Sequence, residues 1–395
     1  MADAFLPYGR QSIDESDIAA VEAALRGAFL TTGPAVAAFE AEFARATGAV
    51  HAVSCSSGTA ALHLAALALG LGEGDIVIVP TVTFLATANA ARYVGAEVRF
   101  ADVDPDTGLL TPDTLTRAVD AAEKAGRGAV KSVFPVHLNG QVCDMEALAG
   151  VAHRAGWTIV EDACHALGGA AVGDCRHSDM AVFSLHPVKT ITAGEGGVIT
   201  TRQAALASRL FRMRNHGIVR EPDGFQEAGQ AFDTDGVANP WYYEMPEPGF
   251  NYRLSDIHAA LAASQLRRLA GFVARRQALA ARYDRLLGGL APVVRPTRRF
   301  GESAPALHLY VVLIDFDAIG RSRAGVMRRL RDAGIGTQVH YLPVHRQPYY
   351  RARYGNLYLP GADAYYARAL SLPLFPAMAD SDVDRVVDAL AAVIG

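Results

Sequence analysis

The sequence predicts an α/β fold in which a large, mainly parallel sheet is joined to a small C-terminal α+β domain. From about residue 50, short β-branched runs alternate with alanine-rich helical runs. Such alternation is typical of parallel strands that helices cover on both faces. The chain has 395 residues, of which 51% are hydrophobic. At roughly 150 residues per domain, this length is enough for two or three domains with sizeable cores.

Seven β runs are expected in the large domain. The first five precede helical runs or a Gly-rich turn, and they cover residues 51–57, 75–80, 97–103, 132–140 and 158–163. The last two, at 180–186 and 197–201, follow each other without room for a long helix, so we expect an antiparallel or tightly linked pair there. A helix over 203–217 ends this half of the chain.

The middle of the chain predicts a long loop and then a long helix. Residues 218–251 are rich in Gly, Pro, Asp and aromatics and have no periodicity, so we expect an ordered loop of functional importance. Ser255 is a good N-cap for a helix that runs to near Gly288, with a kink at Gly271.

The remainder predicts a small domain of alternating strands and helices. A strand is expected over 307–316, a helix from Arg323, a second strand within 334–345, and a final helix that ends at the C-terminus. We therefore divide the chain into residues 1–255, the N-terminal segment and the large domain, and 256–395, the linking helix and the small domain.

Composition excludes several classes of partner. With 37 Lys and Arg against 41 Asp and Glu, the formal net charge is -4, so no basic surface is expected for nucleic acid or an anionic membrane. No run of about 18 apolar residues is present, so no membrane span is expected. The N-terminus lacks the features of a secretory signal, and the four cysteines show no CxxC spacing. We expect a cytoplasmic protein with free thiols, without a metal site.

The residues that follow the strands are the first candidates for a site, because open α/β sheets bind ligands at the carboxyl ends of their strands. Gly58, Thr59 and Ala60 follow the first strand and open a helix, where unpaired N–H groups and a hydroxyl suit an anion such as phosphate. An ordinary helix cap is the alternative. Phe84 follows the second strand and offers its ring to a planar ligand, although a phenylalanine there is more often a core residue.

Two further strand ends carry ionisable groups. The strand TIVED ends in Glu161 and Asp162, and His165 lies three residues beyond. A buried carboxylate needs a cationic or protonated partner, and a protonated ring nitrogen would be one. Lys189 follows the strand MAVFS in a nearly uncharged stretch, where desolvation would lower the pKa of its amine and free it to react with a carbonyl. Ser184 offers a second hydroxyl for phosphate.

Together these strand ends supply an anion cradle, an aromatic plate, a carboxylate for a ring nitrogen and an amine for a carbonyl. Pyridoxal phosphate (PLP) has a complement to each of them. A structural or purely binding role would leave the combination of Lys189, Asp162 and Phe84 unexplained.

Four motifs, GTAALHLA, VEDACHALGG, FSLHPVKTITAGEGG and GFNYRLSDIHAAL, stand in the order and spacing of a known family. In them the chain resembles the DegT/DnrJ/EryC1/StrS sugar aminotransferases over nearly its whole length. The resemblance implies PLP-dependent transferase fold type I, which is similar to aspartate aminotransferase. Within the family, HPVK, PWYYEMPEPGFNYR and GIGTQVHYLPVHRQPYY look most like the pseudaminic acid pathway enzymes, which aminate UDP-4-keto-6-deoxy-N-acetyl-L-altrosamine.

The resemblance assigns cofactor roles to eight residues. Lys189 matches the lysine that binds PLP covalently, Asp162 the partner of the pyridinium nitrogen, and Phe84 the ring that stacks on the cofactor. His165 occupies a position where many members of the family carry Gln, which implies a contact near the phenolic oxygen of the cofactor. The phosphate positions are matched by Thr59, Ala60, Ser184 and, from the neighbouring subunit of a homodimer, Asn251.

The resemblance also implies the reaction. L-Glutamate would donate the amino group, pyridoxamine phosphate (PMP) would be the intermediate, and a nucleotide-linked keto-sugar would be the acceptor. Two alternatives stay open: another 3- or 4-keto nucleotide sugar, and a non-catalytic PLP-binding regulatory protein. A subset of the fold carries His in place of this lysine and dehydrates its substrate, but Lys189 is present here. We expect the sugar pocket to include Tyr8, Arg10, His186, Tyr341 and His345, with a structural role as the alternative for His186.

Overall fold

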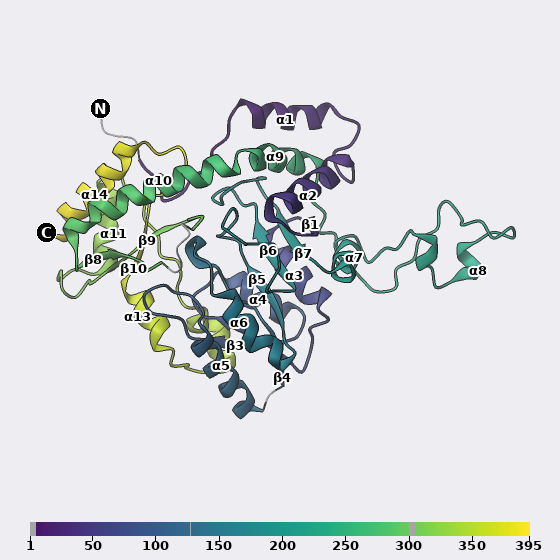
Figure 1. Cartoon of the computed structure of the whole chain (residues 1–395), viewed down its shortest axis with the longest axis horizontal. Helices are drawn as coiled ribbons and strands as arrows, with labels where there is room; N and C mark the ends of the chain where they lie inside the picture. Colours follow the sequence, from purple (N-terminus) through teal and green to yellow (C-terminus); the bar gives the residue numbers. More distant parts are fainter. Residues whose placement is uncertain (1–4, 127, 300–304) are drawn as a thin grey trace.

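A seven-stranded sheet forms the centre of the molecule in a computed structural model that describes residues 5–126, 128–299 and 305–395 (Figure 1). Its strand order is β1-β7-β6-β5-β4-β2-β3, and only β7 runs antiparallel to its neighbours. The expected parallel sheet and its antiparallel closing pair are confirmed. The strands are β1 (His51–Cys55), β2 (Asp75–Pro80), β3 (Glu97–Ala101), β4 (Ala129–Val133), β5 (Thr158–Asp162), β6 (Met180–Ser184) and β7 (Gly197–Thr201).

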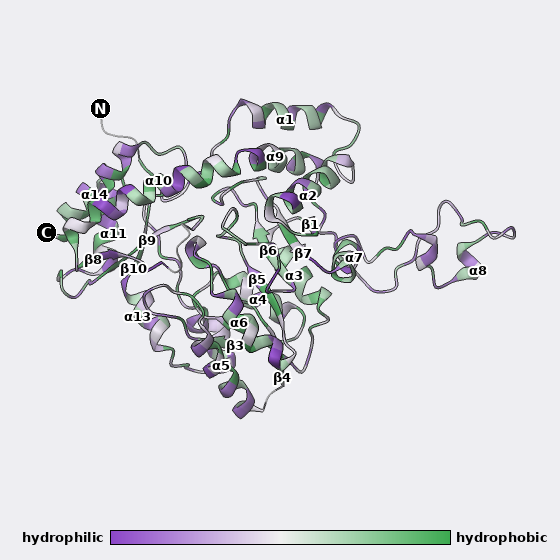
Figure 2. Ribbon diagram, viewed as in Figure 1, coloured by the Kyte–Doolittle hydropathy of each residue, from purple (hydrophilic) through white to green (hydrophobic). Residues whose placement is uncertain are grey.

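Helices cover both faces of this sheet. On one face, α3 (Gly58–Ala68), α4 (Leu85–Tyr93) and α7 (Ala204–Met213) pack against alternate strand residues. The opposite face is covered by α5 (Pro112–Ala125) and α6 (Met145–Ala152) at one end, and by α2 (Pro34–Thr47) at the other. Hydrophobic residues gather in the central strands and in the helices that cover them (Figure 2). Because both faces of the sheet are buried, the sequences of its strands are nearly continuous runs of apolar residues.

The C-terminal domain contains a three-stranded antiparallel sheet of order β10-β9-β8. The strand expected within 334–345 is wrong, because this segment makes only isolated bridges, from Ile335 to Leu6 and from Gln338 to Ser371, and then turns away at Pro343, which has no N–H to donate. The third strand comes instead from residues 369–372. The elements are β8 (Val294–Pro296), β9 (Tyr310–Ile314), α11 (Arg323–Asp332), α12 (Pro348–Tyr354), α13 (Pro360–Arg368), β10 (Ala369–Leu372) and α14 (Asp380–Ile394).

The linking helix is interrupted one turn earlier than expected. It consists of α9 (Asp256–Arg267) and α10 (Leu269–Leu287), and the break is at Arg268, whose φ of -99° and ψ of 1° leave the helical range. The Arg268 guanidinium pairs with Asp17 of α1 (Glu15–Arg26), so the break lies where α1 contacts the linking helix. Gly271 lies inside α10 without a kink. Ser255 caps α9 as expected, accepting the N–H of His258 at 3.2 Å.

Residues 218–250 form an arm that reaches away from the rest of the molecule (Figure 1). Its two sides are joined by the bridge between Val219 and Glu244, and α8 (Ala228–Ala231) lies near its tip. Trp241 on the arm is 72% exposed. The expected ordered loop is therefore present, and it projects from the surface.

The N-terminal segment reaches the small domain. Leu6 makes a parallel bridge to Ile335, and its side chain belongs to the apolar core around β9 and α14. The division at residue 255 stays a prediction. In the described parts of the chain, no helix has the length and apolar character needed to cross a membrane. Short 3₁₀ turns are η1 (Leu138–Gly140), η2 (His153–Ala155), η3 (Pro222–Gly224), η4 (Gly288–Leu290) and η5 (Val344–Arg346).

Candidate active site

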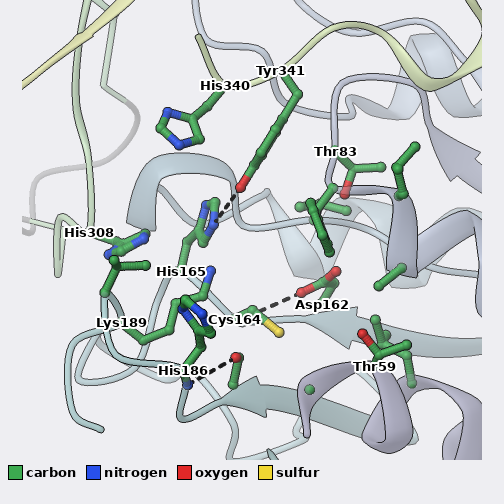
Figure 3. A pocket seen from close by; sticks show the side chains of 18 of the residues that line it. Thr59, Thr83, Asp162, Cys164, His165, His186, Lys189, His308, His340 and Tyr341 are labelled. Atoms are coloured by element: carbon green, nitrogen blue, oxygen red, sulfur yellow. Dashed lines mark hydrogen bonds between the residues drawn. The ribbon is translucent and has the colours of Figure 1, made fainter. Parts of the chain in front are cut away.

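A cavity of about 860 Å³ lies where the carboxyl ends of β1, β2, β5 and β6 meet residues 338–342 of the small domain (Figure 3). These strand ends share one edge of the sheet because the four strands run parallel to one another. Nine of the residues expected from the sequence line this cavity: Tyr8, Thr59, Phe84, Asp162, His165, Ser184, His186, Lys189 and Tyr341.

Four expected residues do not line it. Ala60 is buried directly behind the cavity wall, where its N–H is bonded to Ser57. His345 is buried, with Nδ1 2.7 Å from the Thr81 hydroxyl, so its side chain fastens the small domain to the end of β2. Arg10 is exposed outside the cavity. Asn251 is also exposed, at the base of the arm, where it bridges Asn215.

The N-terminus of α3 is shaped as an anion site. Ser57 is the N-cap and accepts the N–H of Ala60 at 3.1 Å, which leaves the first N–H groups of the helix directed at the cavity. The hydroxyls of Thr59 and Ser184 line the same corner. A Cβ atom on Gly58 would lie 2.9 Å from the Ser184 Cβ, so only glycine lets the helix end approach β6 this closely. The helix dipole and these donors suit a phosphate group.

Replacing Gly58 by alanine should weaken cofactor binding by at least about tenfold, because the added methyl group forces α3 and Ser184 apart. Gly271→Ala is the matched control, since a Cβ there meets nothing within 4 Å and the residue lies inside α10. Spectrophotometric titration of both apo-proteins with PLP measures the effect. Equal dissociation constants for the two variants would contradict the assignment of this corner to phosphate.

Asp162 ends β5 with its carboxylate in the cavity wall. Its Oδ2 accepts the Thr87 hydroxyl at 2.6 Å, and its Oδ1 accepts the N–H of Cys164 at 3.2 Å. These bonds fix the carboxylate and leave lone pairs for one more donor. No cation forms an ion pair with Asp162 among the residues that the structure describes. A protonated ring nitrogen would supply the missing positive charge.

Glu161 and Asp162 point to opposite faces of the sheet, as neighbouring strand residues do. Glu161 Oε2 lies 2.8 Å from His137 Nε2, and its Oε1 accepts the hydroxyl of Ser178. Glu161 is therefore hydrogen-bonded inside the protein away from the cavity, and Asp162 alone of the acidic pair lines the cavity.

Lys189 extends into the cavity from the loop after β6 (Figure 3). Burial lowers the pKa of its amine, while the nearby Cys164 and Asp162 act in the opposite direction. Among the described residues, its Nζ forms neither a hydrogen bond nor an ion pair. An unpaired amine with a lowered pKa is a good nucleophile for a carbonyl carbon.

Three buried histidines surround Lys189 on the small-domain side. His165 and His308 have ring centroids 4.6 Å apart, and His340 Nδ1 lies 2.8 Å from the Ser371 hydroxyl. Burial, followed by the field of Lys189, lowers the pKa of His340 to about 3. Burial also lowers the pKa values of His165 and His308 well below the ordinary range, so all three rings are neutral near pH 7.

The His340 pKa gives the protein a pH-dependent stability. Since the ring is neutral when folded and takes up a proton when unfolded, stability is lost as the pH falls from 6.5 toward 3. At pH 5 the loss from this one group is about 2 kcal/mol. Urea unfolding at pH 7 and pH 5 should therefore show a smaller difference for His340→Gln than for the wild type. The exposed His153→Gln is the control, and an unchanged difference in both variants would refute the expectation.

Several lining residues were not singled out from the sequence. Cys164, Thr83 and Gln338 lie in the cavity wall, and Thr87 holds Asp162 from behind it. Thr87 lies three residues after Phe84, near the start of a helix that follows a strand. This position next to a strand end is a signal from which Thr87 could have been predicted. Gln338 belongs to the small domain, so only the tertiary fold brings it here.

The cavity fits PLP by the chemistry of its donors. Thr59, Ser184 and the end of α3 would hold the phosphate, and the ring of Phe84, 55% exposed, stands beside the cavity as an apolar plate. The carboxylate of Asp162, which forms no ion pair with a described residue, would receive the ring nitrogen, and the amine of Lys189 would bind the aldehyde carbon.

Comparison with known proteins agrees with this fit. Residues 11–391 match the DegT/DnrJ/EryC1/StrS aminotransferase family. Helicobacter pylori PseC, an aminotransferase involved in the biosynthesis of pseudoaminic acid, is similar in fold at 24% identity, with a TM-score of 0.87 and 99% of each chain covered. DesI, solved in the presence of its TDP-sugar product, shares 33% identity with a TM-score of 0.84, over 99% of this chain and 93% of its own.

A third similar structure, Spr1654 from Streptococcus pneumoniae, is known in a PMP form and in a PLP form. The PMP form shares 27% identity with a TM-score of 0.86, over 98% of this chain and 99% of its own. The expected fold of PLP-dependent aminotransferases is confirmed. The chain belongs to the DegT/DnrJ/EryC1/StrS aminotransferase family of PLP-dependent enzymes.

Proposed function

We propose that this enzyme transfers the amino group of L-glutamate to a nucleotide-linked 4-keto-6-deoxy sugar, namely UDP-4-keto-6-deoxy-N-acetyl-L-altrosamine, as in pseudaminic acid biosynthesis. The observation that carries the aminotransferase reaction is the placement of Lys189, Asp162 and Phe84 in the wall of one cavity, next to an anion cradle. The finer choice of sugar is supported by the motifs HPVK and PWYYEMPEPGFNYR and by the likeness to PseC. The cytoplasmic location stays a prediction.

PLP, when bound, supplies an electron-withdrawing ring that stabilises negative charge at the carbon next to the transferred nitrogen. With PLP bound, Asp162 would hold a proton on the ring nitrogen, because its carboxylate is fixed by Thr87 and Cys164 and forms no ion pair with any other described residue. Lys189 Nζ removes the proton from the α-carbon of the donor and later delivers a proton to the sugar carbon from one face. Burial of Lys189 favours the neutral amine that this proton transfer needs.

The cavity has the size for a sugar beyond the cofactor. Tyr8, His186 and Tyr341 line it and are expected to contact the sugar. The runner-up is a related enzyme that aminates another 3- or 4-keto nucleotide sugar, which the likeness to DesI and its TDP-sugar product favours.

A panel of UDP- and TDP-linked keto-sugars distinguishes these two proposals. The holoenzyme is incubated with L-glutamate and each sugar, and mass spectrometry measures the amino-sugar formed. We expect the UDP-linked 4-keto-6-deoxy-L-altrosamine derivative to be the best acceptor. A TDP-sugar with a higher kcat/KM would replace the proposed substrate by the runner-up. No exchange of the amino group from glutamate, seen as unchanged PLP absorbance, would instead favour a non-catalytic PLP-binding protein.

The site is proposed to be completed by a second copy of the chain. Asn251 matches a phosphate-binding position of the family, yet it lies outside the cavity of its own chain. The arm at 218–250 ends at this residue, and its apolar groups, including Trp241 and Met245, are exposed. An arm that projects from the body with exposed apolar side chains is well suited to pack against a partner subunit.

Mixing two impaired variants tests this arrangement. Lys189→Ala and Asn251→Ala subunits should form heterodimers with one intact site, built from Lys189 of one chain and Asn251 of the other. The mixture should therefore exceed the mean activity of its parents after subunit exchange, provided that Asn251→Ala alone is impaired. Exchange is verified with differently tagged chains. Activity at or below the mean, with exchange complete, would place Asn251 in the site of its own chain.

A further inference from the structure

A chain of hydrogen bonds runs from the backbone of Asn139 through the ring of His165 to the hydroxyl of Tyr341. The N–H of Asn139 donates to His165 Nδ1 at 3.3 Å, and His165 Nε2 lies 3.2 Å from the Tyr341 hydroxyl oxygen. Figure 3 shows the Tyr341 hydroxyl meeting His165 above Lys189. The chain thus begins in the large domain and ends at a side chain of the small domain inside the cavity.

The position of the Asn139 N–H is fixed by its surroundings. The carbonyl of Asn139 accepts the N–H groups of His308 and Leu309 at 2.9 and 3.3 Å, and its side-chain amide donates to Tyr365 at 3.2 Å. Its φ of 64° is a left-handed conformation that asparagine tolerates. The following Gly140 is locked in place, because a Cβ there would lie 2.2 Å from the carbonyl oxygen of Ala306.

A backbone N–H only donates, so the nitrogen that receives it carries no proton. His165 Nδ1 is therefore the unprotonated nitrogen, and the neutral ring carries its proton on Nε2. Nε2–H must then donate to the Tyr341 oxygen. The reverse bond, from tyrosine to histidine, would need a proton on Nδ1 facing the Asn139 N–H, and two donors cannot pair.

The direction of this bond decides where Tyr341 points its own proton. The Tyr341 oxygen receives the His165 proton, and among the described residues it has no other hydrogen-bond partner. Its O–H is thereby free for the cavity that Tyr341 lines. Burial raises the pKa of Tyr341, so the hydroxyl keeps its proton.

We infer that His165 is a positioning residue whose tautomer, set by Asn139, makes Tyr341 a hydrogen-bond donor toward an oxygen of the acceptor sugar. A carbonyl or hydroxyl oxygen of the sugar can bond to the Tyr341 O–H, whereas a group that only donates hydrogen bonds, such as an ammonium, is disfavoured beside it. This inference rests on the proposed function for the identity of the acceptor, but not for the tautomer.

The tautomer is tested first, by ¹⁵N NMR of the holoenzyme with ¹⁵N-labelled histidine. The shifts of the two ring nitrogens report which one carries the proton, and the His165 signals are identified by their loss in His165→Gln. We expect a proton on Nε2, an unprotonated Nδ1, and a shifted Nε2–H signal in Tyr341→Phe. A proton on Nδ1, or a doubly protonated ring at pH 7, would overturn the inference.

Kinetics of the two half-reactions test the role of the bond. Tyr341→Phe and His165→Leu should each lower kcat/KM for the UDP-linked keto-sugar about tenfold, the effect of one lost hydrogen bond. In Tyr341→Phe, the bleaching of PLP absorbance by L-glutamate should change much less. The double variant should be no worse than either single one, because both remove the same bond. Tyr358→Phe, at an 83% exposed tyrosine, is the control for the substitution itself.

Rescue by glutamine separates positioning from packing. The Gln side chain can accept the Asn139 N–H with its oxygen and donate to Tyr341 with its amide, so His165→Gln should keep kcat/KM for the sugar within a few-fold of the wild type. If His165→Gln falls as far as His165→Leu, or if both half-reactions fall equally in Tyr341→Phe, the positioning role is wrong.

Failure of the proposed function gives a different result. A wild-type enzyme that aminates no sugar would remove the acceptor from the inference together with the proposed function, while the NMR shifts would still decide the tautomer. A wild-type enzyme that is active while His165 carries its proton on Nδ1 would overturn this inference alone.

Discussion

Lys189→Ala should lower transamination by at least about a thousandfold, because the variant loses both the amine that binds the cofactor and the base that moves the proton. PMP should still bind, since the corner formed by Thr59, Ser184 and the end of α3 and the carboxylate of Asp162 are unchanged. Single-turnover assays with L-glutamate measure the first effect, and titration with PMP measures the second.

The sequence provides clean controls for this experiment. It contains three lysines, and Lys124 and Lys131 are both exposed and remote from the cavity. Lys131→Ala should therefore behave as the wild type. Borohydride reduction of the PLP-loaded enzyme should attach the cofactor to a peptide that contains Lys189. Transamination near the wild-type rate in Lys189→Ala would exclude the mechanism.

Asp162→Asn should lower the rate by about a hundredfold or more, while PLP binding weakens much less. A neutral amide does not hold a proton on the ring nitrogen, so the stabilisation of negative charge is lost while the site keeps its shape. With the amide oxygen in the place of Oδ1, the side chain still accepts the Cys164 N–H, and its NH2 group, in the place of Oδ2, can donate to the Thr87 hydroxyl oxygen. Stopped-flow measurement of the glutamate half-reaction gives the rate.

Glu161→Gln is the comparison for Asp162→Asn, because the same kind of change is made one residue away on the other face of the sheet. This variant should mainly affect stability, since Glu161 contacts His137 and Ser178 and does not line the cavity. A similar loss of rate in both variants would mean that Asp162 acts through the packing of β5 and has no special role at the ring nitrogen.

Much of the large domain could be predicted because its strands are buried on both faces and its helices are regular. The expected β runs ended within about two residues of the observed strands, except the run over 132–140, whose strand β4 ends at Val133, so the strand ends carrying Thr59, Phe84, Asp162 and Lys189 were found correctly. These residues come together simply because parallel strands end at one edge. Local sequence is sufficient for such a site.

Features that depend on tertiary contacts could not be predicted. The linking helix breaks at Arg268, whose guanidinium pairs with Asp17, a residue about 250 positions earlier in the sequence. His345 was expected in the sugar pocket, but its direction is set by Thr81 on another domain. The tautomer of His165 depends on a backbone N–H at Asn139 that no periodicity reveals.

The arm at 218–250 also has an optical consequence. The chain has two tryptophans, and Trp241 is the one on the arm, 72% exposed. In a Trp157→Phe background, the emission of the protein would come from the arm alone. If a second subunit covers the arm, dilution should separate the subunits and shift the Trp241 emission to the red. PLP should be released over the same range of protein concentration, because the emission shift and the loss of PLP depend on one association equilibrium. The fluorescence of a single side chain would then measure how tightly the two chains, and with them the cofactor, are held.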